Sequence, residues 1–243
     1  CGGGEINASA NFYQDKILIG SQDATLYCLN EATGELVWKH TIEDQIRCSP
    51  TVVENRVFLA GCDGKLHIVD LDSGQRVDAV EIGGPTGTTP AASGQRLYFG
   101  TEGGVFFAID WRQAQVVWSV KNDKGLAYRS SAALSARAAI VGGRDKLLRA
   151  FGLEDGKELW NVATRGRVDS SPVIVGERAF FGSADGRLRA VDVNSGDVVW
   201  EHETGGDIAA APAVSQGRIV VGTLRTNELF CFGTKPAPGA ASK

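Results

Sequence analysis

A repeat of about forty residues constrains this chain more than any other feature of its sequence. Six apolar triplets each end in a small residue, and the spacings between these small residues are 40, 40, 42, 40 and 40. The six closing residues are Gly20, Ala60, Gly100, Gly142, Gly182 and Gly222. Short β-branched and aromatic runs bounded by glycine predict buried strands, because they are too short for helices. We therefore expect six copies of one β-rich unit.

Each unit contains four predicted strands, which in the second unit cover residues 50–53, 56–61, 65–70 and 75–82. Repeats of this length with four strands each are typical of a β-propeller, whose blades bury their faces against neighbouring blades. We predict an all-β fold, a β-propeller of four-stranded blades with about six blades in this chain. Because the last unit lacks an outermost strand, a seven- or eight-bladed intact ring stays open as an alternative.

Tryptophan and glycine recur at fixed places in the unit. Eighteen residues after each of the first five closing residues comes a tryptophan, with Asp78 as the exception, and four residues before that position comes a glycine, with Ala114 as the exception. A glycine that follows Asn, Asp, Ser or Thr suits a turn with positive φ. A large indole can fill the wedge between two blades while its N–H binds a carbonyl. These structural positions are Trp38, Trp118, Trp160, Trp200, Gly34, Gly74, Gly156 and Gly196.

Length and charge exclude several classes of protein. One propeller domain over residues 1–233 accounts for most of the 243 residues, and residues 234–243 form a Pro/Ala/Gly-rich segment that predicts a flexible tail. The net charge of −4 with interspersed signs gives no basic surface, so nucleic acid is not expected as a partner. No apolar run approaches the roughly 18 residues that a transmembrane helix needs.

The start of the chain has two interpretations. The run Cys1-Gly2-Gly3-Gly4 resembles the start of a mature bacterial lipoprotein, whose first cysteine carries the lipid. The repeat is already in progress at Glu5-Ile6, which corresponds to Gln45-Ile46, so we favour a truncated start. Membrane contact is expected only through lipidation of Cys1.

Cysteine and histidine give little sign of chemistry. If a tight turn separates the first two strands of the second unit, Cys48 and Cys62 come close enough for a cross-strand disulfide. We favour two separate buried thiols, with the disulfide as the alternative. His40 and His202 share one repeat position on outer strands, and His67 stands alone. Since no histidine pair has metal-ligand spacing, we expect no metal site.

A binding face is predicted where the links between blades and the turns between second and third strands emerge together. The charged residues expected there are Arg47, Arg129, Arg144, Arg165, Arg167, Asp169 and Asp207. Arg47 and Arg129 share one repeat position near the ring axis, where they could grip a carboxylate, phosphate or peptide carbonyl by paired hydrogen bonds. The alternative is that they form internal ion pairs with residues such as Asp44 or Asp169.

The segment Cys28 to Trp38 resembles the PQQ-type propeller repeat, with the pattern Ala-x-Asp-x-x-Thr/Ser-Gly-x-x-x-Trp, and the segment Ala190 to Trp200 fits that pattern fully. The resemblance covers residues 6–233. It implies one of two branches: noncatalytic BamB-like scaffold proteins, or quinoprotein dehydrogenases that bind pyrroloquinoline quinone and calcium. The adjacent Cys-Cys pair of the alcohol dehydrogenases is missing here.

We favour the noncatalytic branch, which implies protein or peptide partners, no cofactor, a monomer, and a place in the periplasm or cell envelope with a lipid anchor if Cys1 is lipidated. No residue is assigned a catalytic role, and enzyme activity is left open. The alternatives are a quinone-dependent oxidoreductase module with pyrroloquinoline quinone and calcium, or a ligand-sensing region of a larger signalling protein.

Overall fold

The computed structural model describes residues 4–233, and all regular secondary structure in that range is β-strand. Six antiparallel sheets follow one another along the chain, five of four strands and a last one of three. This confirms the predicted all-β propeller. Cys1 and the predicted tail, residues 234–243, lie outside the described residues.

Each sheet is one blade, with its strands hydrogen-bonded in sequence order. Blades 1 to 3 consist of β1 (Asn11–Tyr13), β2 (Lys16–Gly20), β3 (Thr25–Asn30) and β4 (Leu36–Thr41); β5 (Thr51–Val53), β6 (Arg56–Ala60), β7 (Lys65–Asp70) and β8 (Arg76–Glu81); and β9 (Ala91–Ser93), β10 (Arg96–Gly100), β11 (Val105–Asp110) and β12 (Gln115–Lys121). Blades 4 to 6 consist of β13 (Ala133–Leu134), β14 (Ala138–Gly142), β15 (Leu147–Gly152) and β16 (Glu158–Ala163); β17 (Val173–Val175), β18 (Arg178–Ser183), β19 (Arg187–Asp192) and β20 (Val198–Glu203); and β21 (Ala213–Ser215), β22 (Arg218–Gly222) and β23 (Leu229–Gly233).

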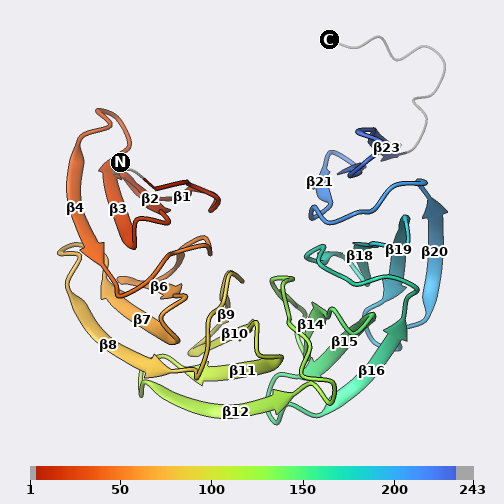
Figure 1. The fold of residues 1–243 in the computed structure, drawn as a ribbon, viewed down its shortest axis with the longest axis horizontal. Helices are drawn as coiled ribbons and strands as arrows, with labels where there is room; N and C mark the ends of the chain where they lie inside the picture. Colours follow the sequence, from red (N-terminus) through yellow and green to blue (C-terminus); the bar gives the residue numbers. More distant parts are fainter. Residues whose placement is uncertain (1–3, 234–243) are drawn as a thin grey trace.

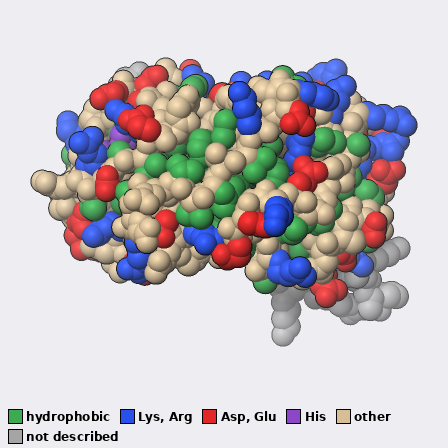
Figure 2. All heavy atoms as spheres, turned by 90° about the horizontal axis from the view of Figure 1, so that it is seen from below, with side chains coloured by type: hydrophobic (Ala, Val, Ile, Leu, Met, Phe, Trp, Pro, Cys, Tyr) green, Lys and Arg blue, Asp and Glu red, His purple; other side chains and the backbone are tan. Residues whose placement is uncertain are grey.

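The blades form an open arc around a common centre, with β4, β8, β12, β16 and β20 along its outside and with blades 1 and 6 at its two ends (Figure 1). Seen from below, aliphatic side chains run between charged ones along this outside (Figure 2). Exposed members of this kind include Val77, Val116, Val117 and Leu159 on the outermost strands. Blade 6 ends on β23, as the missing outermost strand in the sequence predicted.

Hydrophobic clusters lie between successive blades. The cluster between blades 1 and 2 joins Leu18 and Leu26 of blade 1 to Val57 and Leu59 of blade 2, all with no exposed surface. The same positions are buried at the next three interfaces, where the side chains are larger or smaller. Between blades 5 and 6, Phe180 and Ile219 at these positions are only partly buried. Because one blade cannot bury its faces alone, each blade depends on its neighbours for its core.

The tryptophans lie between blades as predicted. Trp38 of blade 1 donates its indole N–H to the carbonyl of Leu71 in blade 2, at 2.9 Å. Trp118 and Trp160 make the same bond to Leu153 and Val193 of the next blade, at 3.1 and 3.0 Å. In each blade from 1 to 5 the register between the third and fourth strands shifts beside this position, as a β-bulge requires.

The two exceptions in the repeat explain each other. Each interblade tryptophan lies against the turn glycine of the next blade, for example Trp38 against Gly74. Asp78 removes the tryptophan between blades 2 and 3, and Ala114 replaces the glycine that this tryptophan would have covered. Trp111 fills the interface from blade 3 instead, with its ring centre 5.4 Å from that of Phe58 in blade 2. The wedge has therefore changed sides at this interface.

Hydroxyl side chains connect neighbouring blades just before their first strands. The backbone N–H groups of Ser9, Ser49, Thr89 and Ser131 each donate to the hydroxyl of the corresponding residue in the next blade, at 2.9 to 3.1 Å. The last acceptor in this series is Ser171. The serine or threonine before the Pro or Ala that opens most units therefore supplies a blade-to-blade hydrogen bond.

Candidate functional site

The predicted binding face is built from one repeated arrangement of backbone. In each blade from 2 to 6, the turn after the second strand donates an N–H to a carbonyl in the link that leads into that blade. Examples are the bond from Cys62 to Gln45, at 3.1 Å, and the bond from Arg144 to Ala127, at 3.0 Å. These bonds hold links and turns together on one face of the ring, which we call the mouth.

Arg47 and Arg129 meet at one hollow in the mouth. The hollow has a volume of about 220 Å³ and is lined by Arg47, Gly87, Glu102 and Arg129. Arg129 donates its Nε–H to Glu102, with N–O distances of 2.9 and 3.0 Å. Arg47 donates to the amide oxygen of Gln45, at 2.8 and 3.1 Å, and no carboxylate among residues 4–233 lies within ion-pair distance of it. The pair therefore leaves one guanidinium charge at the hollow without a carboxylate partner.

A second charged group in the mouth is internally satisfied. Arg144 binds both carboxylate oxygens of Asp169, at 3.0 and 2.9 Å, and Arg167 donates to the same carboxylate at 2.9 Å. The hydrogen bond to Asp169 raises the pKa of Arg144, so this cation stays fully charged. Since one carboxylate serves two guanidinium groups here, the trio has a net positive charge.

The structure places the other two predicted residues apart from these groups. Asp207 forms an ion pair with Arg225 of the next blade. Arg165 lies in the link between blades 4 and 5, where its backbone N–H donates to Asp185 at 3.0 Å. The predicted face therefore divides into separate charged groups, and internal ion pairs account for Arg129, Arg144, Arg167, Asp169 and Asp207.

Sequence reasoning missed a set of polar side-chain pairs, each within one blade, of which three are buried and Asp23–Tyr27 is partly buried. An aspartate three residues after the closing small residue bonds to a side chain four residues further on, on the third strand. The pairs are Asp23–Tyr27, Asp63–His67, Asp145–Arg149 and Asp185–Arg189. The recurring Asp-x-x-x-polar spacing was visible in four units, but alternating polar residues on a strand ordinarily indicate a solvent-facing side.

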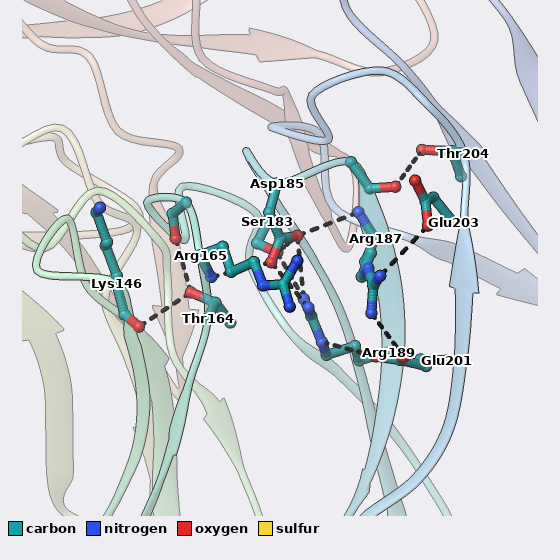
Figure 3. A network of polar contacts seen from close by, with 12 residues as sticks. Lys146, Thr164, Arg165, Ser183, Asp185, Arg187, Arg189, Glu201, Glu203 and Thr204 are labelled. Carbon is teal, nitrogen blue, oxygen red and sulfur yellow. Dashed lines mark hydrogen bonds and ion pairs between the residues drawn. The ribbon is translucent and has the colours of Figure 1, made fainter.

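The pair in blade 5 shows what such a site contains (Figure 3). Arg189 donates to Asp185 at 2.8 and 3.1 Å and to Ser183 at 2.8 Å, and its Nε lies 3.4 Å from Glu201 on β20. Burial alone would raise the pKa of Asp185, but hydrogen bonds from Arg189, Ser183 and the Arg165 N–H outweigh it and lower the pKa to about 2. Two carboxylates thus satisfy one buried guanidinium.

Cys48 and Cys62 are free thiols in the structure. Cys48 packs in the cluster between blades 1 and 2, where burial raises its pKa to about 12. The Cys62 thiol instead lies 3.7 Å from the carbonyl of Thr86, in the link to blade 3. Of the two interpretations, the structure therefore shows two separate thiols.

Residues 4–233 contain neither a cluster of metal-binding side chains nor an apolar helix of membrane-spanning length. Across the described residues, no group of three or more His, Cys, Asp or Glu side chains is arranged to hold a metal ion. Within residues 4–233, no helix is long and apolar enough to cross a membrane.

Comparison with known proteins gives one family and several partial likenesses. The family model described as outer membrane protein assembly factor BamB matches residues 3–121 and 125–235. Among solved structures, the chain is similar to the computationally designed Ika8 protein, with a TM-score of 0.83 and 17% identity, covering 94% of this chain and 71% of that one. It is also similar to BamB from Moraxella catarrhalis, with a TM-score of 0.61 and 14% identity, covering 93% and 82%.

Two curated proteins match shorter segments. The beta-alanine-activating enzyme of Homo sapiens is 27% identical over 104 residues, which are 40% of this chain and 9% of that protein. The quinoprotein ethanol dehydrogenase of Pseudomonas aeruginosa is 31% identical over 80 residues, which are 31% of this chain and 12% of that protein. The matches thus span about a tenth of the length of these relatives.

Proposed function

Because this chain belongs to the outer membrane protein assembly factor BamB family, we propose that it is a noncatalytic propeller that binds other proteins in the bacterial cell envelope. In this proposal it acts as a scaffold in outer-membrane protein assembly, in the periplasm, with a lipid anchor if Cys1 is lipidated. The proposal takes its location and partner class from the family, and its binding surface from the mouth.

The observation that carries the proposal is the hollow between Arg47 and Arg129. It is formed by the irregular links between blades rather than by the repeated strands, and such loops on a rigid scaffold are where binding residues concentrate. A guanidinium without a carboxylate partner can donate two parallel hydrogen bonds to a carboxylate or to peptide carbonyls of a partner. Within residues 4–233, β23 pairs only with β22, and its other edge offers a second mode, in which a partner adds a strand to blade 6.

Reversing the charge of the hollow tests the proposal. We expect Arg47→Glu with Arg129→Glu to weaken partner binding by at least about tenfold, because an acidic partner group would meet like charges. Binding is measured with the partner purified from the native envelope, together with the amount of outer-membrane β-barrel protein in cells that carry only the variant.

The matched control reverses two exposed charges outside the mouth, Lys39→Glu with Arg137→Glu. Both double variants change the net charge equally, so an equal loss of binding in both would attribute the effect to overall charge and contradict a role for the hollow. Thermal unfolding of each variant shows whether the fold is intact.

The likeness to the quinoprotein ethanol dehydrogenase gives a second candidate, a quinone-dependent oxidoreductase module. The residues that the structure describes bring no three His, Cys, Asp or Glu side chains together, so they offer no cluster of carboxylates for the calcium that would accompany pyrroloquinoline quinone. Incubation with pyrroloquinoline quinone and Ca²⁺, followed by gel filtration and absorption spectroscopy, tests this candidate directly. A coeluting chromophore would favour it over the scaffold.

A further inference from the structure

The buried polar position on the third strand differs between blade 2 and blades 4 and 5. In blade 4, Arg149 binds Asp145 in its own turn and also Glu158 on the outermost strand, with the Nε–Oε2 distance at 3.1 Å. In blade 5, Arg189 likewise binds Asp185 and approaches Glu201. Each buried cation therefore has two carboxylates, one from the turn and one from the outermost strand.

Blade 2 keeps the first carboxylate and loses the second. His67 is 3% exposed, and its Nε2 lies 2.8 Å from Asp63, which is the turn carboxylate. Ala79 is the cross-strand partner of His67, where Glu201 is the partner of Arg189. Arg76 is paired with Val69 beside the bulge, where Glu158 is paired with Phe151. Blade 2 therefore has Ala79 at the position of Glu201 and Arg76 at the position of Glu158.

The loss leaves a polar atom of His67 without a partner. Nδ1 of His67 is buried and makes no hydrogen bond within the described residues. Because Nε2 faces a carboxylate, it carries a proton, so Nδ1 is an acceptor in the neutral ring and a donor in the imidazolium. Either is costly when it is buried without a partner, so a group that pairs with Nδ1 would be stabilising.

A hollow adjoins the His67 residue. It has a volume of about 360 Å³ and is lined by His40, Thr41, Ile42, Glu43, Lys65, His67 and Arg76. Two internal pairs account for four of the ionisable groups here, namely Lys65 with Glu43 at 3.2 Å and His67 with Asp63. Arg76 has no ion pair among the described residues. Burial lowers the pKa of His40, and its Nδ1 donates to the carbonyl of Gly74 at 3.1 Å.

We propose that this hollow between blades 1 and 2 binds a small carboxylate, which takes the place that a glutamate side chain fills in blades 4 and 5. In the proposed complex the carboxylate binds the imidazolium form of His67, whose Nδ1–H donates to one carboxylate oxygen, and Arg76 supplies the positive charge at the entrance. The site is separate from the Arg47–Arg129 hollow, since the two share no lining residue.

The test uses succinate as the probe and the imidazole signals of His67 in NMR spectra as the readout. We expect a saturable shift of these signals in the wild-type protein. Ala79→Glu should supply an internal carboxylate, as Glu201 does in blade 5, and weaken succinate binding by at least about tenfold. Ser119→Glu is the matched control, because Ser119 has the same place opposite Phe107 in blade 3 and should bind succinate like the wild type.

A second variant and a second probe complete the test. Arg76→Ala changes an exposed side chain, keeps the fold and should weaken succinate binding several-fold. The proposal is overturned if the wild-type signals do not saturate with succinate, if Ala79→Glu binds it unchanged, or if Zn²⁺ shifts the His40 and His67 signals where succinate does not. In the last case the two histidines would form a metal site.

Discussion

Replacing Trp160 with alanine is expected to lower the free energy of unfolding by about 3–5 kcal/mol, the range observed when a large aromatic side chain is removed from a core. Trp160 is 9% exposed, packs between blades 4 and 5, and donates its N–H to the carbonyl of Val193 at 3.0 Å. Its loss removes the wedge and also leaves a buried carbonyl without its donor. Urea unfolding followed by far-UV circular dichroism measures the effect.

Trp200 offers a matched control at the same repeat position. Its ring is 36% exposed and lies against Phe232 of the three-stranded blade 6. We expect Trp200→Ala to lower the free energy of unfolding by only about 1 kcal/mol, because Trp200 buries less apolar surface on folding than Trp160 does. Equal losses for the two variants would contradict the view that the tryptophans stabilise the protein by filling closed interfaces between blades.

Replacing Gly74 with alanine is expected to cost about 2–5 kcal/mol, from about 1–2 for a left-handed backbone and about 1–3 for overpacking. Gly74 has φ of +69°, and a Cβ atom there would lie 2.5 Å from Cδ2 of Trp38. The urea midpoint of the variant, compared with that of the wild type, gives the cost.

Gly34 separates the two contributions. It occupies the same turn in blade 1 with φ of +71°, but no atom lies within 4 Å of the place of its Cβ. Gly34→Ala should therefore show only the backbone cost, about 1–2 kcal/mol. Ala114 already adopts φ of +50° at this position in blade 3, which shows that the turn accepts a side chain when no tryptophan covers it. If both variants lose the same stability, the contact between tryptophan and glycine is not what the turn requires.

The sequence was sufficient for the repeat, the strands and the place of the tryptophans between blades, because these follow from local periodicity. The predicted strands of the second unit differ from β5–β8 by at most one residue at each end. The sequence was not sufficient to predict that Trp111 of blade 3 replaces the tryptophan that is missing at Asp78 of blade 2. The two residues stand at different positions of the repeat, so a comparison of equivalent positions does not connect them.

The candidate site was predicted less completely for a similar reason. Shared repeat position placed Arg47 and Arg129 near the ring axis, and the structure brings both to one hollow. The pairing of Arg144 and Arg167 with Asp169 depends on how two links approach each other, which no spacing specifies. The Asp145–Arg149 and Asp185–Arg189 pairs look like solvent-facing residues in the sequence, but they are buried on the side of the preceding blade, where Arg149 and Arg189 lie opposite Val141 and Phe181.

The mouth and the hollow between blades 1 and 2 are different kinds of surface. The mouth exposes a guanidinium at an open face, which suits a protein partner whose own groups complete the hydrogen bonds. The second hollow buries a histidine beside a cation, which suits a small molecule. A protein of this family could therefore carry a ligand site in its wall without interfering with its partner surface.

Site-specific photo-crosslinking in living cells tests the central claim most directly, since it asks what touches the mouth. A photoreactive amino acid is placed at Arg47 or Arg129, and at Lys39 or Arg137 outside the mouth, and the crosslinked proteins are identified by mass spectrometry. We expect the two mouth positions to capture a component of the outer-membrane protein assembly machinery and the two outer positions to capture none. The proposal would be contradicted if the assembly machinery were crosslinked at Lys39 and Arg137 and no protein were crosslinked at Arg47 and Arg129.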